Sequence, residues 1–170
     1  MNATTRWSTL STPQGTLYLA AGAGGLQGVW FDGQRHFGGP NPAWQRADDD
    51  PLLLAAAAQL RDWYAGQRRG FDLPLAPLGT PFQQAVWAAL QQIGHGQTTT
   101  YGALAAALGR PSASRAVGAA TGRNPLSIVI PCHRLVGRDG TLTGYAGGLD
   151  RKHALLTFET RAPGVPFEAA

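Results

Sequence analysis

Residues 126–134 read LSIVIPCHR, and the interpretation of the whole chain starts from this stretch. Its first five residues form a short, uncharged run with three β-branched side chains, which predicts a buried strand that ends at Pro131, because proline cannot donate to a sheet ladder. Cys132, the only cysteine of the chain, stands at the predicted strand end, followed by His133 and Arg134. Neighbouring cations favour the thiolate, so this pattern indicates a reactive cysteine.

The same residues also fit plainer interpretations. A lone cysteine is often a small core residue, and a lone histidine is often structural. On an extended chain the side chains of Cys132 and His133 point to opposite faces, so they interact only if the chain turns or a water bridges them. Both arrangements are open at this stage.

Length and composition narrow the class of protein. The 170 residues suit one domain or two small lobes. No apolar stretch approaches a membrane span and the N-terminus lacks a signal-peptide segment, so we expect a cytoplasmic protein with no membrane partner. One cysteine excludes an internal disulfide, and the four histidines show no zinc spacing. Residues 76–170 hold the whole net charge of +4, which suggests a polyanionic partner or serves only solubility.

Changes of pattern along the chain predict an α+β fold with three parts. These are a small N-terminal sheet-and-helix lobe over residues 1–75, a mainly helical C-terminal lobe over 76–160, and a flexible tail over 161–170.

In the N-terminal lobe, residues 17–20 and 26–31 flank a glycine-rich turn and predict a β-hairpin. The pair Asp50-Pro51 supplies an N-cap and a first-turn proline for a helix that ends near Gly66. A short strand is expected over 71–73.

The C-terminal lobe begins with Thr80-Pro81, which predicts a second capped helix. Thr100 is expected to cap a short helix over 101–108, and Ser112 a second one over 113–121. Two short helices around a tight turn fit a helix-turn-helix, and they fit any other helical hairpin equally well.

The second of these short helices has an unusual surface. Residues 116–120 are all small or apolar, so Arg115 is its only long polar side chain. A helix that reads base edges needs several such side chains. Small residues instead suit close, sequence-independent approach to a minor groove.

Two glycine-framed loops, 137–140 and 144–148, follow the cysteine and would form the rim of a pocket. Asp150 is expected to cap a last helix, which ends at Glu159. A carboxylate in a final turn opposes the helix dipole, so a cation or an imidazole should lie beside Glu159.

Taken together, these motifs resemble the O6-alkylguanine-DNA alkyltransferases, also called methylated-DNA–protein-cysteine methyltransferases. The resemblance spans residues 80–159. It rests on four matches in the family's order and spacing: RAVG at 115–118, NP at 124–125, IVIPCHRLV at 128–136 and GYAGGL at 144–149.

The resemblance implies DNA repair by irreversible SN2 transfer of an alkyl group from guanine O6 to the sulfur of Cys132, once per molecule. Thymine O4 is a second candidate alkyl donor. His133 would be a water-linked base, Glu159 the carboxylate that orients it, and Asn124 the residue that fixes the turn. Tyr101 would donate a proton at guanine N3. No cofactor is implied, and no zinc, because the N-terminal cysteines that bind zinc in some relatives are absent here.

A pocket for a flipped base is also implied, in which the Ala146 N–H meets O6 and the carbonyls of Cys132 and Leu135 accept from the exocyclic amine. The implied substrate-binding residues are Leu135, Tyr145, Ala146, Gly147 and Ser127. The partner would be alkylated double-stranded DNA, bound through its minor groove by a monomer, with Arg115 filling the gap left by the flipped nucleotide. The implied DNA-binding residues are Arg115, Ala116, Gly118, Gly102, Arg110 and Arg138.

Without the resemblance, two other functions fit the same residues. One is a Cys-His-Glu hydrolase, although no oxyanion hole is visible in the sequence. The other is a non-catalytic helix-turn-helix protein with a structural cysteine, although side chains that read bases are absent.

Overall fold

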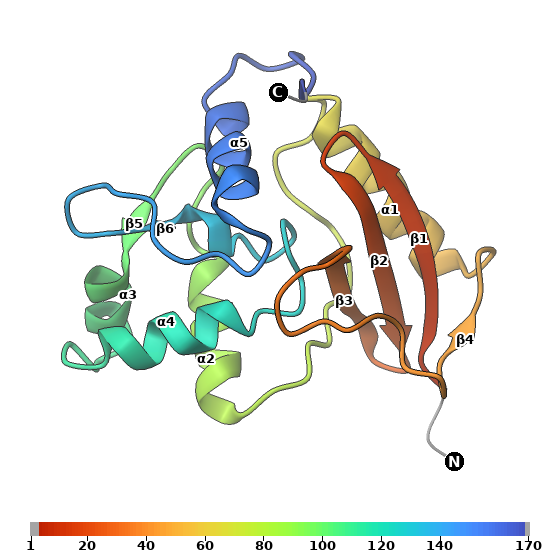
Figure 1. Ribbon diagram of the computed structural model, residues 1–170, viewed down its shortest axis with the longest axis horizontal. Coiled ribbons are helices and arrows are strands. Elements are labelled where there is room, and N and C mark those ends of the chain that lie inside the picture. The colour runs from red at the N-terminus through yellow and green to blue at the C-terminus, as the bar shows by residue number, and fades with distance from the viewer. Residues whose placement is uncertain (1–3, 169–170) are drawn as a thin grey trace.

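The computed structural model describes residues 4–168 and has the α+β architecture predicted from the sequence, with a sheet lobe beside a helical lobe (Figure 1). The helices of the described part are not long and apolar enough to cross a membrane. The elements in chain order are β1 (Arg6–Thr12), β2 (Gly15–Gly22), β3 (Gly25–Phe31), β4 (Gln45–Arg46), α1 (Pro51–Tyr64), α2 (Pro81–Leu90), β5 (Thr99–Thr100), α3 (Tyr101–Ala107), α4 (Ser114–Gly122), η1 (a 3-10 turn, Cys132–Arg134), β6 (Leu135–Val136) and α5 (Leu149–Glu159).

The N-terminal sheet has the strand order β3-β2-β1-β4. Strands β1, β2 and β3 pair antiparallel, and β4 adds a short parallel edge. The predicted hairpin is the β2–β3 pair, whereas β1 was not predicted. Helix α1 packs against the sheet and starts as expected, because the Asp50 side chain accepts from the N–H groups of Leu52 and Leu53. The strand predicted over 71–73 is wrong, since only Leu75 pairs there, in a single bridge to Leu26.

The outer edge of β3 is paired by two segments that lie outside the sheet. Val29 donates to the Pro125 carbonyl at 2.8 Å and accepts from the Ser127 N–H at 2.9 Å. Leu26 pairs in the same way with residues 74–76 of the connector. The sheet lobe therefore directly supports the segment that leads to the cysteine. The exact boundary between the lobes stays a prediction.

The helical lobe begins as the sequence predicts. Thr80 and Gln83 form a reciprocal capping box at the start of α2, and the Thr100 hydroxyl caps α3. Helices α3 and α4 pack against each other and against α2. The cap predicted for α4 is wrong: the helix starts at Ser114 after Ala113, with no side-chain cap.

The strand predicted over 126–130 is also wrong. After the single bridge between Leu126 and Val29, the chain coils into consecutive turns, in which Ile130 donates back to the Leu126 carbonyl at 2.8 Å and Ile128 has a positive φ of 71°. The β-branched side chains are buried, as predicted, but their backbone bonds are local. Cys132 therefore starts a 3-10 turn instead of ending a strand.

The start of the last helix also differs from expectation. Helix α5 follows Gly148 with no side-chain cap, and Asp150 lies inside its first turn, where a carboxylate still complements the dipole. In the tail predicted over 161–170, Phe167 is buried and its N–H donates to the Tyr64 carbonyl at 2.7 Å, and the flexibility of this tail stays a prediction. Residues 169–170 lie outside the described part.

Candidate active site

Cys132 lines a pocket of about 330 Å³ between the two lobes. One wall is helix α4, a second is Tyr101 of α3, a third is the start of the pocket loop (residues 143–148), and the N-terminal lobe contributes Arg35 and His36. The complete lining is Arg35, His36, Tyr101, Gly118, Ala119, Thr121, Gly122, Cys132, Thr143, Gly144, Tyr145 and Ala146.

Asn124 holds the turns that precede the cysteine. Its amide nitrogen donates to the Ile130 carbonyl at 2.8 Å, and its amide oxygen accepts from the Leu126 N–H at 3.0 Å. The side chain is buried, so it replaces the ladder partners that the backbone would have in a strand. This fixes where the 3-10 turn begins and hence where the thiol lies.

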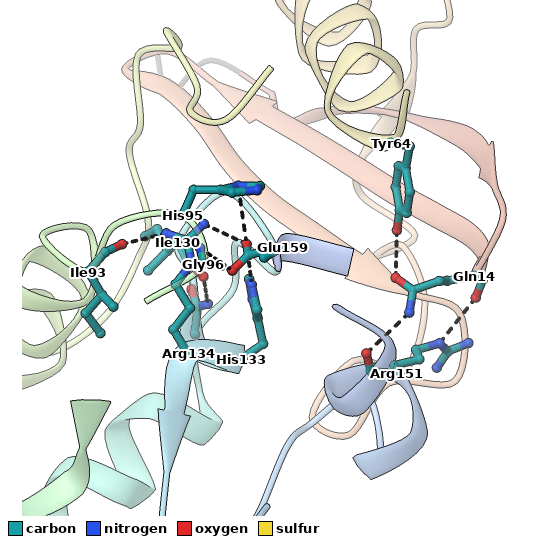
Figure 2. A network of polar contacts seen from close by, with 11 residues as sticks. Gln14, Tyr64, Ile93, His95, Gly96, Ile130, His133, Arg134, Arg151 and Glu159 are labelled. Atoms are coloured by element: carbon teal, nitrogen blue, oxygen red, sulfur yellow. Dashed lines mark hydrogen bonds and ion pairs between the residues drawn. The ribbon is translucent and has the colours of Figure 1, made fainter. Parts of the chain in front are cut away.

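The two residues after Cys132 in the 3-10 turn belong to a buried ionic group outside the pocket lining. This group, the Glu159 cluster, is made of Glu159, His133 and Arg134 (Figure 2). His133 Nε2 lies 2.8 Å from Glu159 Oε1, and Arg134 donates to both carboxylate oxygens, from Nε at 2.9 Å and Nη2 at 2.6 Å. The Gly96 N–H adds a bond at 3.3 Å. The compensation expected for a carboxylate at the end of α5 is therefore present.

The protonation states in this cluster follow from the contacts. Burial raises the pKa of Glu159, but the hydrogen bonds and charges of His133 and Arg134 outweigh it and hold this pKa at about 2. Burial lowers the pKa of His133, with Glu159 opposing the shift. A carboxylate can only accept, so the neutral imidazole carries its proton on Nε2 and leaves a lone pair on Nδ1. That Nδ1 is buried and has no hydrogen-bond partner among residues 4–168.

The thiol itself does not have the pKa expected from its neighbours in sequence. Burial raises the pKa of Cys132, and the groups that oppose this are mainly the Asn124 amide and the Lys152 ammonium. The expectation that the adjacent His133 and Arg134 lower the pKa below its ordinary value is therefore wrong. Arg134 is engaged with Glu159, and His133 is neutral. A base is needed to form the thiolate during reaction.

Lys152 of α5 is fully buried beside the pocket. Its ammonium donates to the carbonyls of Thr143 and Gly144 at 2.9 and 3.2 Å, and the Tyr101 hydroxyl donates to the same Thr143 carbonyl at 2.8 Å. Burial lowers the pKa of Lys152 to about 8, with the Cys132 thiolate opposing the shift. Lys152 and Tyr101 therefore hold the beginning of the pocket loop by hydrogen bonds to its carbonyl oxygens.

The predicted substrate-binding residues are only partly brought together. Tyr145 and Ala146 line the pocket beside Cys132, whereas Gly147 lies one residue further along the loop. Leu135 is buried in β6, and the Ser127 hydroxyl is directed to Gln34 at 2.9 Å. Neither Leu135 nor Ser127 is among the lining residues.

The predicted DNA-binding residues lie on the helical lobe, and one of them, Gly118, lines the pocket. Five of them are exposed, and Gly118 is half-buried in the pocket wall. No atom lies within 4 Å of a Cβ built on Gly102, so this glycine faces open space. The exposed members are Arg115, Ala116, Gly102, Arg110 and Arg138.

The sequence predicted no role for Lys152, Arg35 or His36, and it predicted Arg134 to act on the thiol, whereas Arg134 binds Glu159. A signal exists for Lys152: Lys152, Leu155 and Glu159 recur at helical spacing on one face of α5, so two charges share a face with a core leucine. Buried opposite charges need partners. No local signal marks Arg35 and His36, which reach the pocket from a loop of the other lobe.

Metal-ligating side chains are not gathered together in the part of the chain that the structure describes. Among residues 4–168, no three His, Cys, Asp or Glu side chains form a group that could hold a metal ion. The chemistry available is that of the Cys132 thiol and two phenols, Tyr101 and Tyr145, which line one cavity. The residue after the thiol, His133, adds a buried neutral imidazole with a free lone pair.

The fold and the site together define a thiol-dependent group-transfer protein. A family model described as "6-O-methylguanine DNA methyltransferase, DNA binding domain" matches residues 81–161. A methylated-DNA–protein-cysteine methyltransferase of Methanosarcina acetivorans is 44% identical over 154 residues, which cover 90% of this chain and 97% of the relative. A similar relative from Haemophilus influenzae is 41% identical over 87% of this chain and 82% of its own length.

A crystal structure of Mycobacterium tuberculosis OGT in complex with DNA is 41% identical, covers 95% of both chains and superimposes with a TM-score of 0.84. The chain belongs to the methylated-DNA–protein-cysteine methyltransferase family, as the resemblance of its motifs implied.

Proposed function

We propose that this protein repairs DNA by transferring the alkyl group of O6-alkylguanine, and of O4-alkylthymine as a second donor, irreversibly to Cys132. The observation that carries the proposal is the position of the thiol, which lines an open pocket and is followed in the same 3-10 turn by a His133 that Glu159 holds. Family membership supports the same activity.

In the proposed reaction the thiol proton passes through a water to Nδ1 of His133, and the sulfur attacks the alkyl carbon. The S–C bond forms as the C–O6 bond breaks, and the electron pair of that bond goes to the guanine. The imidazolium that results is stabilised by Glu159 at 2.8 Å. This route explains why a thiol with a raised pKa can still react.

The guanine that leaves takes up a proton, for which the phenol of Tyr101 in the pocket lining would be the donor. Its hydroxyl would exchange its bond to Thr143 for one to guanine N3. The Ala146 N–H would donate to O6, and the carbonyls of Cys132 and Leu135 would accept from the exocyclic amine. No cofactor is needed, because the bond made replaces the bond broken.

The proposed partner is alkylated double-stranded DNA, bound as a monomer through its minor groove by α3 and α4 acting as a helix-turn-helix. The base must leave the stack, since the thiol lies inside a pocket that a paired base cannot enter. The exposed Arg115 would occupy the vacated position, and the small exposed Ala116 and Gly102 would allow close approach. Arg110 and Arg138 would contact phosphates. A free reactive thiol suits a reducing cytoplasm.

The test is the intact mass of the protein after incubation with a duplex that contains one O6-methylguanine. We expect a stoichiometric gain of one methyl group by the wild type and none by Cys132→Ala, with DNA affinity largely retained by the variant. Repeated turnover without a mass change would instead indicate hydrolysis, and transfer by Cys132→Ala would exclude this cysteine as the acceptor.

A further inference from the structure

The far half of the pocket loop is held differently from its beginning. Lys152 and Tyr101, both of the helical lobe, bind the carbonyls of Thr143 and Gly144. Further along, the Tyr145 carbonyl accepts within the loop from the Gly148 N–H at 2.9 Å, but the Ala146 carbonyl accepts from the backbone N–H of Arg35 in the sheet lobe, also at 2.9 Å. This places a bond from the sheet lobe on the residue whose own N–H faces the substrate in the proposed reaction.

The neighbouring Gly147 carbonyl accepts from Nη1 of Arg151 at 3.1 Å. Arg151 belongs to α5, but its other contacts are in the sheet lobe. Its Nε donates to the Gln14 carbonyl at 3.3 Å, the Gln14 amide donates back to the Arg151 carbonyl at 3.3 Å, and the Tyr64 hydroxyl donates to Gln14 Oε1 at 3.0 Å (Figure 2). One guanidinium thus connects the β1–β2 turn to the pocket loop.

Packing reinforces the same connection. The Arg151 guanidinium lies over the buried ring of Phe31, 4.6 Å from its centroid, at the end of β3. A Cβ built on Gly147 would be only 3.1 Å from Cδ2 of Phe31. The loop therefore rests directly on the sheet lobe at this point, and a planar, multi-donor side chain spans the contact in a way that a lysine cannot reproduce.

We propose that Arg151 is a positioning residue for alkyl transfer. By joining Gln14 and Phe31 of the sheet lobe to the Gly147 carbonyl, it fixes the pocket loop so that the Ala146 N–H meets the departing O6. The proposal rests on the proposed function of Cys132, and it gives the N-terminal lobe a part in the chemistry.

The experiment compares wild type, Arg151→Met and Arg151→Lys with the free base O6-benzylguanine, which removes DNA contacts from the measurement. Methionine keeps much of the apolar stem and removes every donor. We expect the limiting first-order rate to fall about tenfold or more in Arg151→Met, since a small misplacement of a reacting group can cost up to about a hundredfold. Arg151→Lys should be intermediate, because one donor can be restored. Alkylation of Cys132 by iodoacetamide, which needs the thiol but not the loop, should be unchanged.

Arg46→Met is the matched control, because Arg46 also lies over an aromatic ring of the sheet lobe, 5.2 Å from the centroid of Trp7. Its side chain donates to Asp48 and not to the pocket loop. It should react at the wild-type rate. A wild-type rate in Arg151→Met would overturn the proposal, and so would parallel losses of the benzylguanine and iodoacetamide rates.

If Arg151→Met does not fold, the test rests on Arg151→Lys. A folded lysine variant with the wild-type limiting rate would overturn the proposal. A reduced limiting rate with unchanged iodoacetamide alkylation would support it. If the wild type itself does not accept the benzyl group, the proposed function is contradicted. If the wild type reacts and the Arg151 variants react at the same rate, only the role of Arg151 is contradicted.

Discussion

The two sides of Cys132 are built in opposite ways. Behind it, the Glu159 cluster is buried, and both oxygens of its carboxylate are bound by His133, Arg134 or the Gly96 N–H. In front of it, the pocket is lined by glycines, alanines, two half-buried tyrosines and the exposed Arg35 and His36, and it is open to the surface. The base must be held in one orientation to accept a proton, while the substrate side must admit a base together with its backbone. Rigidity is therefore concentrated on the side of the thiol that no substrate touches.

The largest effect is expected from breaking the rigid side. Glu159→Gln removes a buried charge but leaves Arg134 buried opposite it, which should lower the free energy of unfolding by about 3 to 5 kcal/mol. The alkyl-transfer rate should fall about a hundredfold at a temperature where the variant is folded, because His133 loses the partner that stabilises its charged form. Urea unfolding and single-turnover kinetics measure the two effects.

Glu168→Gln is the matched control, because Glu168 pairs with Arg161 at 3.4 Å while its side chain is 75% exposed. Its loss should cost less than about 1 kcal/mol. Equal effects of the two substitutions would contradict the contrast between a buried and an exposed carboxylate.

Acid should remove the same stabilisation without a mutation. The pKa of Glu159 is held at about 2, below the value of about 4.3 for an unfolded chain, so the unfolded state binds the extra proton between these values. Stability from this group is complete above about pH 4.3 and is lost as the pH falls towards about 2, by an amount on the order of 3 kcal/mol. The pKa of His133 is also lower in the folded protein than its ordinary value of about 6.5. Folding stability therefore falls for this group too as the pH drops below about 6.5.

Urea unfolding between pH 7 and pH 3 tests this prediction. The wild type and Glu168→Gln should both lose stability on acidification, first in the histidine window and then in the carboxylate window. Stability that stays level over the whole range would show that the Glu159 cluster is not coupled to folding.

A smaller effect is expected on the open side. Arg115→Ala should reduce transfer from duplex DNA about tenfold, equivalent to about 1.4 kcal/mol, because nothing then fills the position of the extruded base. Reaction with free O6-benzylguanine should be unchanged, since no base has to leave a stack. Arg61→Ala, which removes the same charge from an exposed site on α1, is the control. Equal losses on both substrates would exclude the role of Arg115 in flipping.

The sequence predicted the helices better than it predicted the active-site backbone. Asp50, Thr80 and Thr100 cap helices where the local pattern places them, because a cap and a first-turn proline act within a few residues. The apolar composition of 126–130 reports burial, and burial alone does not distinguish a strand from the turns that Asn124 imposes.

The candidate site divides in the same way. The motif around Cys132 is contiguous, so the thiol and its imidazole could be found from the sequence. Arg134, Lys152 and Arg151 obtain their roles from contacts with distant segments, such as the bond from Arg151 to Gln14, 137 residues away. Local patterns carry no information on such contacts.

The pairing of the β3 edge has a consequence for how the protein is made. An unpaired strand edge is a template for intermolecular association. In this chain Leu26 and Val29 receive their partners from residues 74–76 and 125–127, which leave the ribosome well after β3 itself. The nascent sheet therefore carries an open edge until the second segment is synthesised. A fragment that stops before residue 125 should aggregate, although it contains every strand of the N-terminal sheet.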